Sequence, residues 1–169
     1  MAGATRTPEF LSKNPNGRIP TLELDDGTCL AESNAILWYL AERSPFVPDG
    51  RIARAQVLQW MFFEQYSHEP YVATPRFILK HLAPNSPRRA ELPDRLARGR
   101  AALAVMNSHL RAHRFFVSDR YTIADIALYA YTHVAHEAQL DLEPYPAVGT
   151  WLSRVASQPR YIPITWKPT

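Results

Sequence analysis

The spacing of apolar residues changes near residue 50 of this chain, and the change restricts the folds that it can adopt. Ahead of that point, Leu22 and Leu24 alternate with polar neighbours, which is the period of a β-strand. Beyond it, apolar residues recur only at helical spacing, most regularly between Ile123 and Val134. The sequence therefore predicts a predominantly helical α+β chain, with a β-hairpin and one helix followed by an all-α helical bundle.

The hairpin is predicted around Asp26-Gly27, between two short strands. This dipeptide favours a type I′ turn, which needs positive φ at both central positions. A helix follows, and Ser33 is expected to cap its first turn. A lone hairpin with one helix is marginal on its own. We therefore expect this part of the chain to rest on the later helices, on a second subunit or on further strands.

Residues 45–50 form a predicted linker, which separates a first domain over 1–44 from a second over 51–169. In the second domain, a long helix is predicted from about residue 52 until Pro70 or Pro75 disturbs it. Further helices are predicted over 92–110, from Ile123 onward, and around Trp151.

The composition excludes several classes of protein. The chain of 169 residues holds one cysteine, Cys29, which excludes an internal disulfide framework and a cysteine-rich zinc or iron–sulfur site. Its net charge of +3 is too small to argue for a nucleic-acid partner. No apolar run approaches the roughly twenty residues that span a bilayer, and residues 1–10 do not resemble a signal peptide. We expect a soluble, cytoplasmic protein with no membrane or nucleic-acid partner.

Two short motifs could bind a small ligand. Glu32-Ser33 opens the predicted helix, where free N–H groups and the positive end of the helix dipole suit a carboxylate. The Ser33 hydroxyl could add a hydrogen bond, and the Glu32 carboxylate could pair with an ammonium group. Ile19-Pro20 starts the first strand, a place that suits a residue without an N–H group. The plainer interpretations are a helix cap with a solvated acid and an ordinary trans peptide bond.

Residues 14–40, which contain both motifs, closely resemble the glutathione-binding half of glutathione transferases. Residues 118–125 resemble the capping segment of that family's helical domain, and the likeness runs from about residue 5 to residue 166. The resemblance implies a partial thioredoxin-like domain, followed by the all-α domain of the family.

The resemblance also implies roles for individual residues. It assigns Glu32 and Ser33 to the γ-glutamyl end of glutathione. It implies that the Ile19–Pro20 peptide bond is cis, which would expose the Ile19 backbone to the cysteinyl amide of the ligand. Arg18 would lie near the glycyl carboxylate, and a solvated surface arginine is the alternative.

The expected activity depends on a residue that we do not find in this sequence. In the family, an activating Ser, Tyr or Cys ends a first strand, and this chain begins after that strand, a helix and a second strand. We expect the catalytic residue upstream. With it, the resemblance implies a cytoplasmic, homodimeric detoxification enzyme that conjugates glutathione, as cosubstrate, to a hydrophobic electrophile without a metal. The alternative is a non-catalytic glutathione-binding or protein-interaction module on the same scaffold.

Other residues have competing interpretations. Trp60, Phe63 and Tyr66 could line a hydrophobic cosubstrate pocket, face a partner subunit or simply pack. Thr122 and Asp125 have the spacing of a capping box, which we interpret as structural.

Three further chemistries are weaker hypotheses. Cys29 could serve as the nucleophile of a thiol enzyme, but a buried free cysteine usually packs as a small hydrophobe. His133 and His136 could share a helix face, but they lack the order of a zinc-peptidase motif and we predict no metal. The arginines between 88 and 100 are interrupted by acids, so a solvated helix face is the better interpretation.

Overall fold

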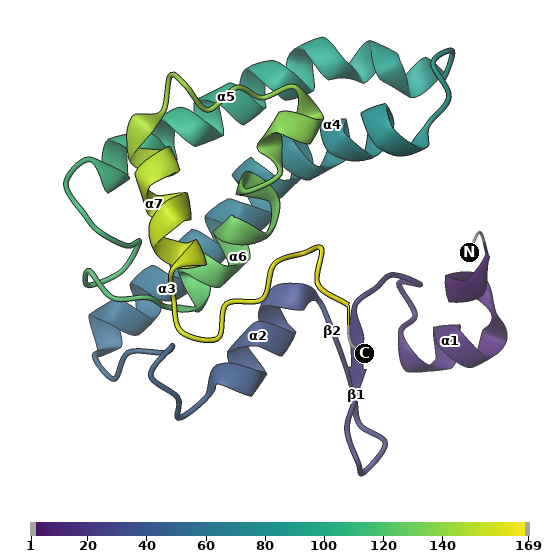
Figure 1. The fold of residues 1–169 in the computed structure, drawn as a ribbon. Helices are drawn as coiled ribbons and strands as arrows, with labels where there is room; N and C mark the ends of the chain where they lie inside the picture. Colours follow the sequence, from purple (N-terminus) through teal and green to yellow (C-terminus); the bar gives the residue numbers. More distant parts are fainter. Residues whose placement is uncertain (1–2, 168–169) are drawn as a thin grey trace. The chain divides into compact units, whose positions relative to one another are not determined.

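The computed structural model describes residues 3–167 and divides into two compact units, one up to Val47 and one from Pro48 (Figure 1). It confirms the predicted α+β class, with a β-hairpin and helix in the first unit and a helical bundle in the second. Within residues 3–167, no helix is both long enough and apolar enough to cross a membrane.

The first unit is built around an antiparallel pair of strands, in which Thr21 pairs with Ala31 and Glu23 with Cys29. Two short helical segments precede the pair, and one longer helix follows it. In chain order the elements are η1 (Ala4–Arg6), α1 (Pro8–Lys13), β1 (Thr21–Glu23), β2 (Cys29–Ala31) and α2 (Ser33–Ala41).

The hairpin forms as predicted, but its turn is not the type I′ turn that we expected from Asp26-Gly27. Gly27 has φ +83°, whereas Asp26 is not among the residues with positive φ. The Leu24 N–H donates to the Thr28 carbonyl at 2.9 Å, which leaves three residues in the loop. The Asp26 carboxylate accepts the Thr28 N–H at 2.9 Å. This hydrogen bond, between an aspartate side chain and the backbone N–H two residues later, closes the three-residue loop.

The second unit is a helical bundle in which α5 packs against α4 and α7, while α3 packs against α6. Figure 1 shows α4 and α5 side by side. The elements are α3 (Arg51–Phe63), η2 (Glu64–His68), α4 (Glu69–His81), η3 (Pro87–Glu91), α5 (Leu92–Leu110), α6 (Ile123–Thr132), η4 (Ala135–Ala138) and α7 (Pro146–Ala156).

The long helix that begins the bundle is disturbed before it reaches either proline. Five residues, Glu64–His68, form a π-helical turn, and α4 then continues through Pro70 and Pro75. Pro70 is the second residue of α4, which follows the π-helical turn without a break, so its missing N–H removes one backbone donor to that turn. Pro75 lies inside the helix and leaves the carbonyl four residues earlier, that of Tyr71, without its usual donor.

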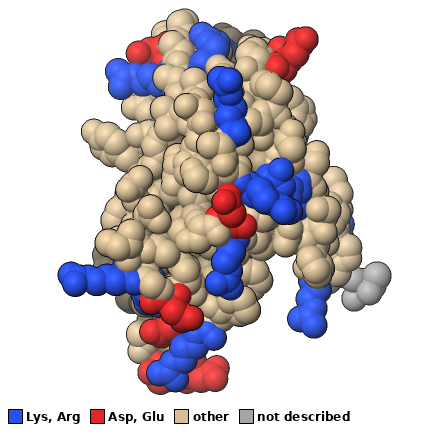
Figure 2. Space-filling view, turned by 90° about the vertical axis from the view of Figure 1, so that its left-hand side faces the viewer, with Lys and Arg blue, Asp and Glu red and all other residues tan. Residues whose placement is uncertain are grey.

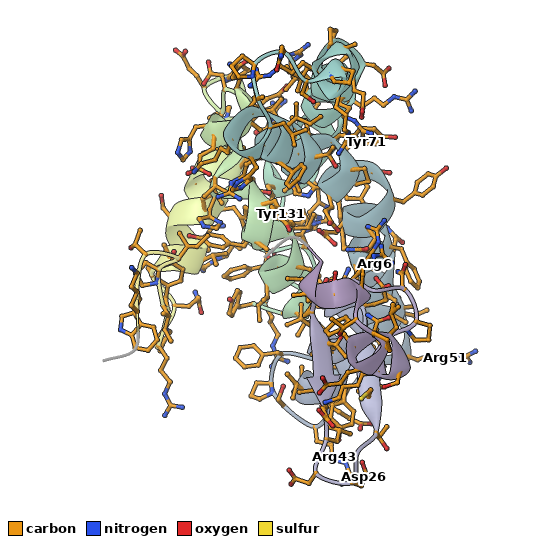
Figure 3. All side chains as sticks on the ribbon, turned by 90° about the vertical axis from the view of Figure 1, so that its right-hand side faces the viewer. Arg6, Asp26, Arg43, Arg51, Tyr71 and Tyr131 are labelled. Carbon is orange, nitrogen blue, oxygen red and sulfur yellow. The ribbon has the colours of Figure 1, made fainter. Side chains whose placement is uncertain are left out.

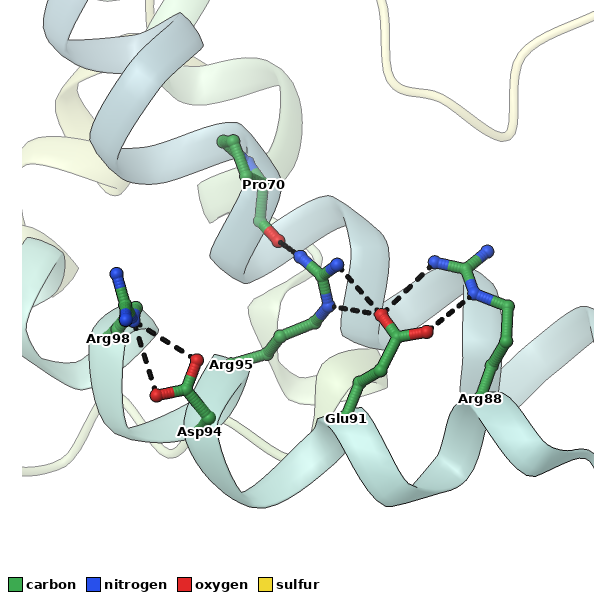
Figure 4. A network of polar contacts seen from close by, with 6 residues as sticks. All are labelled: Pro70, Arg88, Glu91, Asp94, Arg95 and Arg98. Carbon is green, nitrogen blue, oxygen red and sulfur yellow. Dashed lines mark hydrogen bonds and ion pairs between the residues drawn. The ribbon is translucent and has the colours of Figure 1, made fainter.

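The start of α5 is joined to α4 by charged side chains (Figure 4). Glu91 pairs with Arg88 at 2.8 Å and with Arg95 at 2.7 Å, and Arg95 Nη1 also donates to the Pro70 carbonyl at 2.9 Å. Hydrogen bonds from both arginines lower the pKa of the Glu91 carboxyl to about 2. Several arginines of the basic stretch are therefore engaged with carboxylates on the protein's own surface.

His68 is fully buried at the end of the π-helical turn, and its surroundings set its protonation state. Its Nε2 lies 2.8 Å from Thr132 Oγ1. The Thr132 hydroxyl donates its only proton to the Leu128 carbonyl at 2.6 Å, so the imidazole must be the donor at Nε2. Nδ1 is buried and has no hydrogen-bond partner among the described residues. Burial lowers the pKa of His68 to about 3.

We expect the protein to lose stability in mild acid because of His68. Between the ordinary histidine pKa near 6.5 and the folded value of about 3, His68 binds a proton in the unfolded chain but not in the folded chain. The free energy of unfolding should therefore fall by about 2 kcal/mol from pH 7 to pH 5. Denaturant unfolding at both pH values measures it. His68→Gln should remove most of this fall, whereas His136→Gln, at an exposed site, should leave it. If the free energy of unfolding of His68→Gln fell as much between pH 7 and pH 5 as that of the wild type, the role assigned to His68 would be contradicted.

Candidate functional site

The hairpin brings the two predicted ligand-binding motifs to the same end of the first unit. Pro20 directly precedes β1, and Glu32 directly follows β2. Because Thr21 pairs with Ala31, the residues just outside that pair lie next to each other across the strands. The strand register therefore brings Pro20 close to Glu32, although these two residues are twelve positions apart in the sequence.

The Ile19–Pro20 peptide bond is cis, as the resemblance implied. The Ile19 side chain is 74% exposed, and the flanking Arg18 and Pro20 are exposed as well. Within residues 3–167, the Ile19 N–H and carbonyl make no hydrogen bond. A backbone amide and carbonyl without partners, next to a strand, can pair with an extended ligand as an added strand would.

Glu32, and not Ser33, is the N-cap of α2, and its side chain makes no capping hydrogen bond. The expectation that Ser33 caps the helix is wrong: it is the first helical residue. Its hydroxyl and the first N–H groups therefore lie at the end of the helix that favours an anion. Glu32 has φ +70° and ψ 118°, a conformation that costs a non-glycine residue free energy. Such backbone strain is concentrated at functional sites.

The aromatic residues proposed for a cosubstrate pocket lie in different surroundings. Trp60 is 8% exposed, and its ring packs edge-on against Phe63 with 5.2 Å between centroids. Tyr66 is 84% exposed. Trp60 also borders an open surface hollow of about 450 Å³, which sequence analysis missed because its other walls come from a distant helix end: Val105, Ser108, His109, Ala112 and His113.

Asp125 completes the capping box predicted with Thr122 and does more than that. Its Oδ2 accepts the Thr122 N–H at 2.9 Å and the Thr122 hydroxyl at 3.1 Å. Its Oδ1 accepts the Phe116 N–H at 3.2 Å and the Trp151 indole N–H at 2.9 Å. Burial raises the pKa of the carboxyl, and these donors oppose that rise. The fully buried Asp125 thus joins three segments of the second unit.

The remaining candidates have ordinary surroundings. Cys29 is partly exposed on β2, with Sγ 3.6 Å from the Gly27 carbonyl oxygen. His133 Nδ1 lies 2.9 Å from the Tyr129 carbonyl oxygen, and its ring stacks on that of Tyr129 at 4.7 Å. His136 is exposed.

Comparison with known proteins decides the family. Residues 59–159 match the glutathione S-transferase C-terminal domain, and residues 1–43 match the glutathione S-transferase N-terminal domain. The chain belongs to the glutathione S-transferase family. A crystal structure of glutathione S-transferase from Pseudomonas fluorescens is 54% identical, with a TM-score of 0.92 over 96% of this chain and 81% of that one.

The chain is also similar to a glutathione transferase solved with glutathione and to an elongation factor. A glutathione transferase from Burkholderia graminis, solved with two glutathione molecules bound per subunit, is 27% identical. Its TM-score is 0.79, over 92% of this chain and 69% of that one. Elongation factor 1-gamma of Equus caballus is 33% identical over 168 residues, which cover 92% of this chain. The chain spans only about a third of that relative, 36% of its length.

Proposed function

We propose that this protein binds glutathione at the shared end of the hairpin and α2. The observation that carries the proposal is the strand register, which brings Pro20, next to the unpartnered Ile19 backbone, close to Glu32. The Glu32 carboxylate would pair with the α-ammonium of the γ-glutamyl group, and the Ser33 hydroxyl with helix N–H groups would hold its carboxylate. The Ile19 backbone would pair with the cysteinyl amide, while Arg18 would face the glycyl carboxylate. The two glutathione molecules bound per subunit of the Burkholderia relative support glutathione as the ligand.

The reaction proposed for the bound peptide is conjugation to a hydrophobic electrophile. The glutathione thiolate forms a carbon–sulfur bond as the leaving group departs with its electron pair, and the thiol proton goes to solvent. A group that stabilises the thiolate is needed at neutral pH, and we assign it to no residue of this sequence. Trp60, Phe63 and Tyr66 stay our proposal for contacts with the electrophile.

We also propose that the protein works as a homodimer in the cytoplasm, with detoxification as its role. α3 exposes two large apolar side chains, Ile52, which is 72% exposed, and Phe62, which is 67% exposed. Figure 2 shows a face on which uncharged side chains predominate. A second copy that covered the exposed Ile52 and Phe62 side chains would remove apolar area from water. The mass of the protein in solution, measured by light scattering, tests this part of the proposal.

Glu32→Gly should weaken glutathione binding without lowering the stability of the fold. Losing the carboxylate should weaken glutathione binding about tenfold or more, because an ion pair with the ligand is lost. The free energy of unfolding should hold or rise, since glycine accepts φ +70° without steric cost. Titration calorimetry and denaturant unfolding measure the two effects. Glu42→Gly, at φ −57° at the other end of α2, is the control and should leave the affinity unchanged.

A conjugation assay separates the enzyme from the second candidate function, a binding or interaction module. The similarity to elongation factor 1-gamma over 92% of this chain favours that candidate. With a chloronitrobenzene electrophile, turnover above the uncatalysed rate that Ser33→Ala abolishes would establish the transferase. Glutathione binding without turnover by the protein isolated from its source cell would favour the module. Absence of glutathione binding would contradict the site itself.

A further inference from the structure

We propose that Asn14 is a positioning residue of the glutathione site, which holds the turn that presents Arg18 and Ile19. The inference rests on the proposed function, because it concerns how the same site is kept in shape. Asn14 is the C-cap residue of α1, and it is buried, whereas Arg18 and Ile19 are exposed. It acts through the backbone of those exposed residues.

The Asn14 side chain is buried, with 4% exposure, inside the turn that it starts. Its Nδ2 donates to the Arg18 carbonyl at 2.8 Å and to Thr21 Oγ1 at 3.1 Å. Its Oδ1 accepts the Asn16 N–H at 3.1 Å. One amide group therefore spans the turn from its first residues to the start of β1. A buried amide with three partners can adopt few other arrangements without losing hydrogen bonds.

A second contact braces the same turn from outside. Arg6 Nη1 donates to the Asn16 carbonyl at 3.2 Å. Gly17 has φ +62°, and a Cβ atom there would lie 2.5 Å from Arg6 Nη1 and 2.9 Å from the Thr5 carbonyl oxygen. The turn thus fits closely against the N-terminal segment. In Figure 3, Arg6 lies at the end of the first unit that is remote from the hairpin tip at Asp26.

These contacts fix the direction of the peptide group just ahead of Ile19. The Arg18 carbonyl accepts both the Asn14 amide and, at 3.2 Å, the Thr21 hydroxyl. With that carbonyl held inside the turn, the Ile19 N–H, which belongs to the same planar peptide unit, must point the opposite way. The exposed Ile19 backbone is therefore oriented before a ligand arrives. Preorganisation of this kind raises affinity because less entropy is lost on binding.

Asn14→Asp is the decisive variant, with Asn16→Ala as its control. Aspartate keeps the size and the Oδ1 acceptor but replaces the amide donor, so it repels the Arg18 carbonyl. Asn16 lies two residues away in the same turn, and only its backbone, not its side chain, makes hydrogen bonds among the described residues. We expect Asn14→Asp to weaken glutathione binding about tenfold, and Asn16→Ala to change it less than about twofold.

Amide spectra recorded during the glutathione titration separate positioning from simple loss of structure. At saturation the Ile19 amide of Asn14→Asp should shift much less than in the wild type, while the Ser33 amide should shift as before. Loss of both shifts would mean that the unit is disrupted. Wild-type affinity in Asn14→Asp would mean that the site does not depend on the Asn14 hydrogen bonds. Either result overturns the proposal.

Crystal structures of the ligand-free variants test whether Asn14 holds the Arg18 carbonyl, even if the proposed function fails. The Arg18 carbonyl should turn away in Asn14→Asp and keep its direction in Asn16→Ala. An unmoved carbonyl in Asn14→Asp would overturn the inference whether or not glutathione binds. A turned carbonyl in a protein that does not bind glutathione would instead contradict the proposed function, while Asn14 would still be shown to orient the turn.

Discussion

Replacing Asp125 with alanine should lower the free energy of unfolding by about 4 kcal/mol. The carboxylate is fully buried and accepts hydrogen bonds from Thr122, Phe116 and Trp151. Alanine leaves those N–H groups in the core without partners, and each unsatisfied buried donor costs roughly 1–3 kcal/mol before water or local relaxation offsets it. Denaturant unfolding followed by far-ultraviolet circular dichroism measures the loss.

Two further variants keep this prediction testable. Asp125→Asn has nearly the same shape and keeps one acceptor oxygen, so it should lose about 2 kcal/mol and still fold. Asp94→Ala removes a carboxylate that is 69% exposed and pairs with Arg98 on the surface, and it should leave stability within experimental error. Equal losses at positions 94 and 125 would contradict the role assigned to Asp125.

Gly99→Ala should destabilise the protein by about 3 kcal/mol, although alanine is the better helix former. Gly99 lies inside α5, and a Cβ atom there would be 2.6 Å from the Tyr71 carbonyl oxygen and 3.0 Å from a methyl group of Leu140. The carbonyl belongs to the backbone of α4, so it cannot swing aside. It is also the carbonyl that Pro75 deprives of its helical donor, which means that the two helices meet where α4 is irregular.

Gly149→Ala, in α7, is the matched control and should change stability in the opposite direction. No atom lies within 4 Å of a Cβ atom at Gly149, so only the gain in helix propensity remains. Thermal or denaturant unfolding should show a stabilisation of about 0.5–1 kcal/mol. Destabilisation by both substitutions, or by neither, would contradict the view that the Tyr71 contact sets the effect at Gly99.

Part of the proposed glutathione site could be predicted from the sequence. Ile19, Pro20, Glu32 and Ser33 could be named because their motifs are short and their chemistry is local. The sequence could not show that Glu32 takes positive φ and the N-cap position in place of Ser33, since that depends on how the chain leaves β2. The role of Asn14 was also hidden, because an Asn-Pro pair indicates a turn without showing which carbonyl its amide meets.

By itself, the sequence determined the features that depend on neighbours along the chain. The hairpin, the helical bundle and the capping box at Asp125 follow from side-chain period and from hydrogen bonds across a few residues. Tertiary structure alone decided that Trp151 meets Asp125 and that Gly99 meets Tyr71. The physical reason is that close packing joins residues that are dozens of positions apart, and no local pattern records which of them will share a site.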